Sequence, residues 1–396
     1  MTSLSSAPGH ARAAQLEVRA ALTAAIDTVR RNIERFGDRY PDDTTRDGFY
    51  PLRPAAGGVP EGGNRGWTTS FVPGMQWIAW EATGDDVFRD AALRHAANFE
   101  ERMREGVDLD THDLGFLYSL ACITAWRLTG DEEARAAAIA AADHLMTRVL
   151  EPAGIIQAWG DLSDPEERGR TIIDSLMNMP LLTWATEQTG DKRYAEAVLR
   201  HTLQLRDNMI RPDDTTYHTF YWDPTTGEPL RGATAQGAHD DSCWARGQAW
   251  GIYGFALNYR ATGDERFLDA SRRCAAYFLA HLPADGVAFW DLVYTDGSDA
   301  PRDSSAAAIA VSGLRELALA ETDPAAAERA VEAADRILAS LIAGYTPAEG
   351  ESDALLLHGV YSLPAREGVD EGNLWGDFYY LEALMRTADP EWRLYW

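Results

Sequence analysis

The chain has 396 residues, of which 45% are hydrophobic and 10% aromatic, a composition typical of a packed globular enzyme rather than a disordered or fibrous chain. Its formal net charge of −26 excludes nucleic acids and anionic membrane surfaces as partners, because both require a basic face. The first ten residues are small and polar, and no segment approaches the roughly 20 apolar residues of a membrane span, so the sequence predicts a cytoplasmic protein.

Motifs for metals and cofactors are absent from the sequence. Cys122, Cys243 and Cys274 lack metal-ligand spacing and leave one residue unpaired in any disulfide scheme, which fits a reducing compartment. The chain contains no Walker A loop, no dinucleotide-binding glycine motif after a strand and no HExxH helix. We therefore expect chemistry without a cofactor or a metal.

Recurrent turns divide the chain. The first helix is expected over residues 12–35, where apolar residues recur at helical spacing. Thr-Gly-Asp turns follow at Thr83, Thr129, Thr189 and Thr262, and looser copies begin at Thr322 and Thr387. Gly suits the left-handed residue after a helix, and Asp accepts hydrogen bonds from the free N–H groups of the next helix. Each turn therefore predicts that one helix ends and another begins.

Two kinds of helix alternate between these turns. Amphipathic helices are expected after the turns, over 85–104, 131–149, 191–208, 264–281 and 324–344. More apolar helices are expected before them, over 68–82, 113–128, 174–188, 244–261, 303–320 and 375–387. Six half-exposed and six buried helices predict an all-α (α/α)6 barrel. We expect a single domain over residues 1–396, with residues 1–11 flexible.

The long connections should gather at the barrel end where the buried helices begin, opposite the short turns. Trp, carboxylate, His, Gln and Arg side chains stand at or before these helix starts, namely at Trp67, His112, Asp113, Asp174, the segment 236–250, Asp303, Trp375 and Asp377. Trp rings stack on sugars, carboxylates accept hydroxyl groups or move protons, and the other types fix orientation. The mouth of the barrel is therefore the predicted carbohydrate site.

Asp113 and Asp174 stand out because each is at the start of a buried helix and neither belongs to a turn. A capping role remains open for both, as it does for Asp303 and Asp377. If the two share a pocket, repulsion and desolvation raise one pKa, whereas helix N-terminal dipoles favour the ionised form. We expect one ionised Asp that holds the substrate and one protonated Asp that donates.

Several binding candidates keep two interpretations. Arg246, near the start of a buried helix, needs either an internal Asp or a substrate carboxylate as acceptor. Trp244 and Trp250 are six residues apart, so the sequence leaves open which of them faces a substrate. His218 suits either a structural hydrogen bond or substrate binding.

Together these motifs resemble the unsaturated glucuronyl hydrolases of glycoside hydrolase family 88, from about Trp67 to the end of the chain. The matching segments are Trp67-Thr68-Thr69, His112-Asp113-Leu114-Gly115-Phe116, Ile173-Asp174 with Met177-Asn178, His218, Gln236-Gly237, Trp244 to Trp250, Asp303 to Ala308 and Trp375-Gly376-Asp377. The related unsaturated rhamnogalacturonyl hydrolases more typically carry Asn where this chain has Gln248, which favours the glucuronyl family.

The resemblance implies an (α/α)6 barrel that releases 4,5-unsaturated glucuronic acid from the non-reducing end of lyase-generated oligosaccharides by hydrating the enol-ether double bond. It implies that Asp174 is the general acid and base, and that Asp113 holds the ring hydroxyls and tunes Asp174. The residues that it implies for binding the unsaturated uronate are Trp67, His112, His218, Gln236, Trp244, Arg246 and Trp250.

Two other functions remain open at this stage. Sugar 2-epimerases share the barrel but depend on a pair of pocket histidines, for which this chain offers no comparable candidates, and a non-catalytic sugar-binding protein would leave the double bond intact. The parent polysaccharide is also open. Ser362 and Arg366, in the 345–374 connection, are candidates for meeting a sulfate, with a solvated loop as the alternative. We expect a monomer or a weak homo-oligomer.

Overall fold

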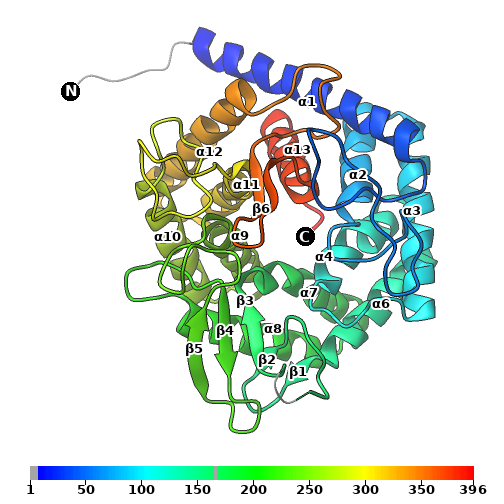
Figure 1. Cartoon of the computed structure of the whole chain (residues 1–396), viewed down its shortest axis with the longest axis vertical. Coiled ribbons are helices and arrows are strands. Elements are labelled where there is room, and N and C mark those ends of the chain that lie inside the picture. Colours follow the sequence, from blue (N-terminus) through cyan, green and yellow to red (C-terminus); the bar gives the residue numbers. More distant parts are fainter. Residues whose placement is uncertain (1–7, 165–166) are drawn as a thin grey trace.

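The computed structural model describes residues 8–164 and 167–396, with side chains from residue 15 onward. In this part of the chain, six inner and six outer helices form a ring, and the sequence runs once around it from blue to red (Figure 1). Residues 1–7 of the segment predicted to be flexible lie outside the described residues, and α1 begins at Pro8. Among the described residues, no helix is both long and apolar enough to cross a membrane.

The two rings alternate along the chain. The inner helices are α2 (Phe71–Thr83), the continuous run α4 (Leu114–Tyr118), η1 (Ser119–Ile123) and α5 (Thr124–Thr129), then η2 (Ile173–Asn178) with α7 (Met179–Thr189), α9 (Ala245–Thr262), α11 (Ser304–Ala320) and α13 (Leu374–Ala388). The outer helices are α1 (Pro8–Phe36), α3 (Asp86–Glu105), α6 (Glu132–Met146), α8 (Lys192–Met209), α10 (Glu265–Ala280) and α12 (Pro324–Gly344). Each inner helix contacts the next and α13 contacts α2, so the ring closes. The predicted (α/α)6 barrel is confirmed.

The turns lie together at one end of the barrel, as their sequence predicts. Gly84, Gly130, Gly190 and Gly263 adopt φ values between +69° and +79°, the left-handed conformation that glycine tolerates. The following Asp side chains accept the first free N–H groups of the next helices, at Asp85, Asp131, Asp191, Asp264 and Asp323. The sixth turn was predicted wrongly, because residues 390–396 after it form no helix.

Two inner helices begin irregularly. The helix expected over 113–128 contains the π-helical segment η1, where Thr124 donates to the Ser119 carbonyl from its side-chain hydroxyl, at 3.0 Å, and also from its backbone N–H. The helix expected from residue 174 starts instead as the 3₁₀ turn η2. The 3₁₀ turn η2 carries Asp174 itself, whereas η1 begins within the inner helix, six residues after Asp113. Such segments often mark functional sites, because they re-aim side chains that a regular helix would place elsewhere.

Small sheets stiffen the long connections, a feature that the sequence analysis missed. Antiparallel strands pair as β1 (Val149–Leu150) with β2 (Ile155–Ile156), as β3 (Arg170–Ile172), β4 (Thr219–Trp222) and β5 (Pro229–Ala233) in that order, and as β6 (Gly359–Ser362) with β7 (Glu367–Glu371). In the central sheet Thr171 faces Phe220, some fifty residues away in sequence. Strands this short take their stability from distant partners, so their own sequences carry little signal.

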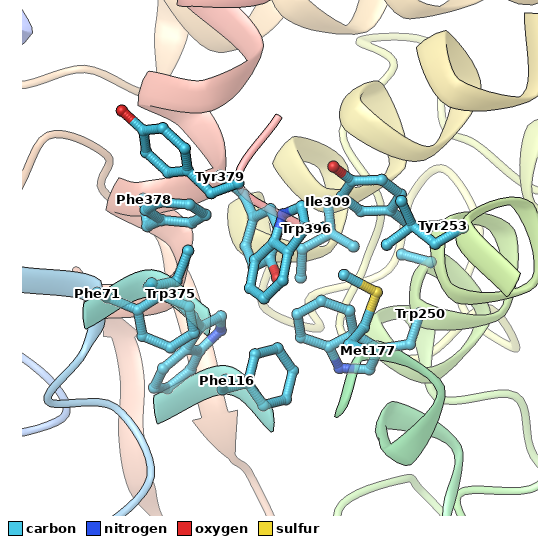
Figure 2. Packing of buried hydrophobic residues seen from close by; sticks show 14 of the residues in the cluster. Phe71, Phe116, Met177, Trp250, Tyr253, Ile309, Trp375, Phe378, Tyr379 and Trp396 are labelled. Carbon is cyan, nitrogen blue, oxygen red and sulfur yellow. The ribbon is translucent and has the colours of Figure 1, made fainter. Parts of the chain in front are cut away.

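An aromatic core lies on the barrel axis beneath the mouth (Figure 2). Trp396 stacks on Tyr379 with ring centroids 6.1 Å apart and also meets Phe116, at 5.8 Å. Phe116 in turn contacts Trp250 at 5.6 Å and Trp67 at 5.7 Å. These large rings fill the barrel, so the mouth has a solid apolar floor.

Candidate active site

His112, Asp113 and Asp174 converge at the mouth of the barrel. Asp113 immediately precedes α4, and Asp174 is the second residue of η2. The His112 Nε2 atom lies 3.2 Å from Asp113 Oδ1 and 3.6 Å from Asp174 Oδ1. The two carboxylate side chains are 16% and 14% exposed, whereas His112 is buried. The two residues favoured by the sequence therefore share one partly exposed site.

Neither carboxylate is committed to capping a helix. Asp113 makes no side-chain cap hydrogen bond to α4 and instead accepts a 2.8 Å hydrogen bond from the Thr111 hydroxyl. Asp174 Oδ1 is buried and has no hydrogen-bond partner among the described residues. An unpaired buried carboxylate oxygen is costly unless it is protonated or bound by a ligand.

The surroundings separate the pKa values of the pair. Burial raises the pKa of Asp174 to about 7, although the positive charge of His112 acts to lower it. The negative charge of Asp113 adds to the rise. Burial alone would also raise the pKa of Asp113, but His112, with hydrogen bonds from Thr111 and Asn178, holds it below the ordinary value. Asp174 is thus the group able to carry a proton near neutral pH, and Asp113 is the ionised partner.

His112 links the two carboxylates electrostatically. Burial alone would lower its pKa, but Asp113 and then Asp174 raise it above the ordinary value. These three side chains also form a group that could hold a cation, since their ligand atoms lie within 4.8 Å of one another. One imidazole and two carboxylates are an ordinary donor set for a divalent ion. The same atoms serve acid–base chemistry without one.

Arg246 pairs with an internal acid. Its Nη1 donates to Asp303 Oδ2 at 2.7 Å and to the Val360 carbonyl at 2.6 Å, and its Nη2 donates to Gln236 Oε1 at 2.6 Å and to the Tyr361 carbonyl at 2.8 Å. Asp303 also caps α11 by accepting from the Ser305 N–H. Of the two interpretations left open for Arg246, the internal ion pair is the one observed. Its guanidinium therefore orients Gln236 and joins α9, α11 and β6.

Aromatic rings extend from this ion pair to form a wall. The Arg246 guanidinium lies 4.3 Å from the Trp244 ring centre and 5.0 Å from that of Trp375. Trp67 stacks on Trp375 at 5.2 Å and donates through Nε1 to the Tyr361 hydroxyl at 3.1 Å. Trp67 is half-buried, so part of its indole remains open to a ligand.

His218 presents an unused donor next to this wall. Its Nδ1 accepts from the Ala235 N–H at 3.2 Å, and its ring meets Trp244 edge-on at 4.8 Å. Burial lowers the pKa of His218 to about 3, with Arg246 adding to the fall, so the ring is neutral and its proton sits on Nε2. Nε2 is buried and has no partner among the described residues. A neutral N–H in this position suits a sugar oxygen.

The sequence matches the family described as Glycosyl Hydrolase Family 88 over residues 53–379. The chain belongs to this family. It is 44% identical to the unsaturated chondroitin disaccharide hydrolase of Streptococcus pneumoniae, over 96% of this chain and 94% of the relative. Unsaturated glucuronyl hydrolase from Streptococcus agalactiae matches the fold with a TM-score of 0.91 at 44% identity, covering 96% of this chain and 94% of that one. A variant of the latter complexed with dGlcA-GalNAc6S matches with a TM-score of 0.83 at 41% identity, over 96% and 94% of the two chains.

The family and the enzyme class predicted from the sequence are thereby confirmed. The chain is a glycosidase of family 88, of the unsaturated glucuronyl hydrolase type. The relatives named above favour this activity over the rhamnogalacturonyl, epimerase and non-catalytic alternatives. The roles of single residues at this family 88 site remain predictions.

Some predicted site residues lie apart from the cluster. Trp250 is 1% exposed and packs on Phe116 and Tyr379 in the core, so of the two tryptophans Trp244 is the one next to His218 and Arg246. Ser362 and Arg366 lie at the turn of the β6–β7 hairpin. Ser362 is buried and its hydroxyl accepts from the Ala365 N–H, at 3.3 Å, whereas Arg366 is exposed.

Asp377 does not cap α13, the alternative left open for it, because Asn373 does so by accepting from the Gly376 N–H. Asp377 accepts instead from the N–H groups of Leu355 and Leu356, at 2.8 and 3.0 Å, and from the Tyr50 hydroxyl at 2.9 Å. It therefore ties the connection before β6 to the inner ring.

Supporting residues of the family 88 site escaped the sequence analysis. Asp291 is fully buried and accepts from the Ala238 N–H at 2.9 Å, the Ser242 hydroxyl at 2.6 Å and the Cys243 N–H at 3.2 Å. It thereby holds the segment that carries Gln236. An isolated Asp in a loop gave no signal, because only the fold brings it to the 238–243 segment, some fifty residues away in sequence.

Proposed function

We propose that Asp174 is the general acid and base of this family 88 enzyme, with Asp113 as its ionised partner. The enzyme releases the terminal 4,5-unsaturated glucuronic acid from disaccharides such as those derived from glycosaminoglycans. The observation that carries the proposal is the pocket itself, where burial raises the pKa of Asp174 to about 7 beside a carboxylate of lowered pKa. A carboxyl group that carries a proton near neutral pH can donate it to carbon.

The first step is protonation of the enol ether. Protonated Asp174 gives its proton to C4 of the double bond, and the electron pair of that bond forms the new C4–H bond. Positive charge then develops at C5 and is shared by the ring oxygen as an oxocarbenium ion. The ionised Asp113 stabilises that charge through space and accepts hydrogen bonds from the ring hydroxyls.

The second step is addition of water at C5. The carboxylate of Asp174, now ionised, removes a proton from a water molecule as its oxygen bonds to C5, which restores the acid. The resulting hemiketal opens to a 5-keto uronic acid and frees the remaining sugar. Because the anomeric carbon is not attacked, the carboxylate separations that distinguish inverting from retaining glycosidases do not apply here.

Binding of the unsaturated uronate is assigned to the aromatic wall. Trp67 and Trp244 supply apolar faces, and the His218 Nε2–H donates to a sugar oxygen. Arg246 keeps its donors for Asp303, Gln236 and two carbonyls, so it attracts the substrate carboxylate through charge rather than by a bidentate pair.

Replacing Asp174 with Asn is the direct test. Asn is similar in shape but cannot donate an acidic proton, so kcat should fall by at least about a thousandfold while binding changes little. The loss of ultraviolet absorbance of the double bond measures turnover, and calorimetry with an unsaturated chondroitin disaccharide measures affinity. The exposed Asp241 gives a matched Asp-to-Asn control that should behave as wild type. Near-normal turnover in the Asp174 variant would rule out its assigned role.

Sulfate recognition by Arg366 is a separate proposal. Arg366 is exposed on the hairpin that presents Tyr361, and its side chain makes no hydrogen bond or ion pair among the described residues. Arg366→Ala should raise KM about fivefold for a sulfated unsaturated disaccharide and leave the unsulfated one unchanged, as expected for an exposed charge pair worth about 1 kcal/mol. Ser362→Ala is the companion variant. Equal KM changes for both substrates would show that neither residue meets a sulfate.

A further inference from the structure

A chain of hydrogen bonds holds the turn that presents Asp174. The next residue, Ser175, is fully buried, and its Oγ lies 2.8 Å from Nε2 of His201, a buried residue of α8. The same hydroxyl donates to the Ile172 carbonyl at 2.7 Å. The other nitrogen of His201, Nδ1, accepts from the Ile156 N–H of β2 at 3.0 Å. Asp174 thus lies between Ile172, whose carbonyl is fixed, and Ser175, whose side chain is fixed.

The direction of each hydrogen bond in this chain is determined. Because Nδ1 accepts from a backbone N–H, it carries no proton. Burial lowers the pKa of His201 to about 3, with the positive charge of His112 adding to the fall, so the ring is neutral. Its single proton therefore sits on Nε2 and is donated to Ser175, whose own proton goes to the Ile172 carbonyl.

This direction excludes a nucleophilic Ser–His pair. A general base must accept the serine proton, but here His201 Nε2 is the donor and the serine proton is already committed to a backbone carbonyl. Ser175 is also fully buried and out of reach of a substrate. The pair therefore takes no part in bond making or breaking. Its position next to Asp174 allows it to hold that residue in place.

The far end of the same turn is held as well. Asn178 Oδ1 accepts from the Phe116 N–H at 2.8 Å, three residues after Asp113. A side chain at Gly115 would overlap the Asn178 backbone, because an added Cβ would lie 2.2 Å from the Asn178 Cα. At the first residue of η2, the Ile173 N–H donates to the His218 carbonyl at 3.1 Å. The turn η2 is therefore held at its first residue, at Ser175 and at its last residue.

We propose that His201 and Ser175 are positioning residues for Asp174, which hold η2 so that its carboxyl group stays desolvated and aimed at the reacting carbon. This inference rests on the proposed role of Asp174 as general acid. The groups that face Asp174 from other elements are His112 and Asp113 before α4 and Arg246 on α9. None of them belongs to the His201–Ser175 chain, so that chain can be broken while these charges remain.

Two substitutions of His201 separate its two hydrogen bonds. His201→Asn keeps an acceptor near the Nδ1 position for the Ile156 N–H but loses the donor to Ser175. His201→Gln keeps a donor near the Nε2 position for Ser175 but loses the acceptor. We expect His201→Asn to lower kcat about 10- to 100-fold with little change in KM, since misplacement of a catalytic group by about 1 Å has effects of this size. His201→Gln should stay within about threefold of wild type.

The pH profile adds a readout that a merely structural role would not move. A loosened turn admits water to Asp174, so its pKa falls towards the ordinary value. The basic limb of kcat should therefore shift to lower pH in His201→Asn and stay in place in His201→Gln. His95→Asn is the control for losing a buried histidine, since His95 lies on the outer helix α3 and should affect melting temperature only.

The outcomes are decisive in both directions. Loss of kcat with a shifted limb in His201→Asn, but not in His201→Gln, supports the inference. A wild-type profile in His201→Asn overturns it, and so do equal losses in both variants with an unmoved limb. If His201→Asn does not fold, Ser175→Ala replaces it with the same expectations. Asp174→Asn, assayed alongside, tests the role of Asp174 as general acid. A failure of that role can therefore be distinguished from a failure of the role given to His201.

Discussion

Asp113 and Asp174 are the same residue type, a few ångströms apart, yet their surroundings give them different protonation states. Asp113 accepts from Thr111 and contacts His112, and these interactions favour its ionised form. Asp174 Oδ1 is buried without a hydrogen-bond partner among the described residues, so its proton is retained to higher pH. Because the two side chains are almost equally exposed, the difference arises from the charge of His112 and the hydrogen bonds at Asp113 rather than from depth.

The pKa of Asp174 predicts how the activity depends on pH. A general acid works only while protonated, so kcat/KM should be level below about pH 7 and fall tenfold per pH unit above it. Asp113→Asn removes a negative charge that raises the pKa of Asp174. In this variant, the basic limb of the residual activity should therefore lie at lower pH. Absorbance assays between pH 5 and 9 measure both profiles. A limb at the same pH in both enzymes would contradict the proposed coupling.

At the residue level, the sequence was most informative where a chemically suitable side chain stands at the start of an inner helix. Asp113 and Asp174 could be selected because helix starts at one barrel end are few. The partner of Arg246 could not be selected, because Asp303 lies 57 residues away and only the packing of α9 against α11 brings the two together. His201 and Asp291 gave no signal for the same reason.

Among the elements, the connection between α12 and α13 is held in part by a buried carboxyl group. Asp377 on α13 accepts from two N–H groups of this connection. Burial raises the pKa of Asp377 to about 8, although the hydrogen bond from Tyr50 acts to lower it. The connection leads into β6, which carries Tyr361 and two backbone carbonyls that accept from Arg246. Through this connection, α13 therefore helps to position β6 and the side of the site that β6 forms.

Removing this carboxyl group should loosen that side of the mouth. Asp377→Ala leaves two buried N–H groups and the Tyr50 hydroxyl without an acceptor, so the free energy of unfolding should fall by about 3 kcal/mol and KM should rise. Urea denaturation and initial rates measure the two effects. Asp377→Asn keeps an acceptor oxygen and should be much less affected. Similar losses in both variants would mean that the charge, rather than the hydrogen bonds, holds the connection.

Across the whole molecule, the two ends of the barrel have separate tasks. The turns end the inner helices with left-handed glycines and start the outer helices with Asp caps. The site occupies the other end, where the inner helices begin irregularly and the connections are long. The turns and the site are therefore about 16 residues apart along an inner helix, about 24 Å at 1.5 Å per residue.

This separation predicts that a turn can be weakened without touching the chemistry. Asp131 caps α6 by accepting from the N–H groups of Glu133 and Ala134, at 3.0 and 3.1 Å. Asp131→Ala should lower the free energy of unfolding by about 1 kcal/mol, the usual value of an N-cap, and leave kcat and KM unchanged. Thermal unfolding and the absorbance assay measure the two. A changed kcat would show that the end with the turns communicates with the mouth.

The sequence by itself determined the barrel and the identity of the two catalytic candidates. Helix periodicity, left-handed glycines and N-caps are local effects, and local effects can be read from neighbouring residues. Tertiary structure alone decided the strands of the mouth, the internal partner of Arg246, the hydrogen-bond chain through His201 and the split pKa values of Asp113 and Asp174. Each of these depends on groups that are distant in sequence, and desolvation exists only once the surrounding helices have closed around the pocket.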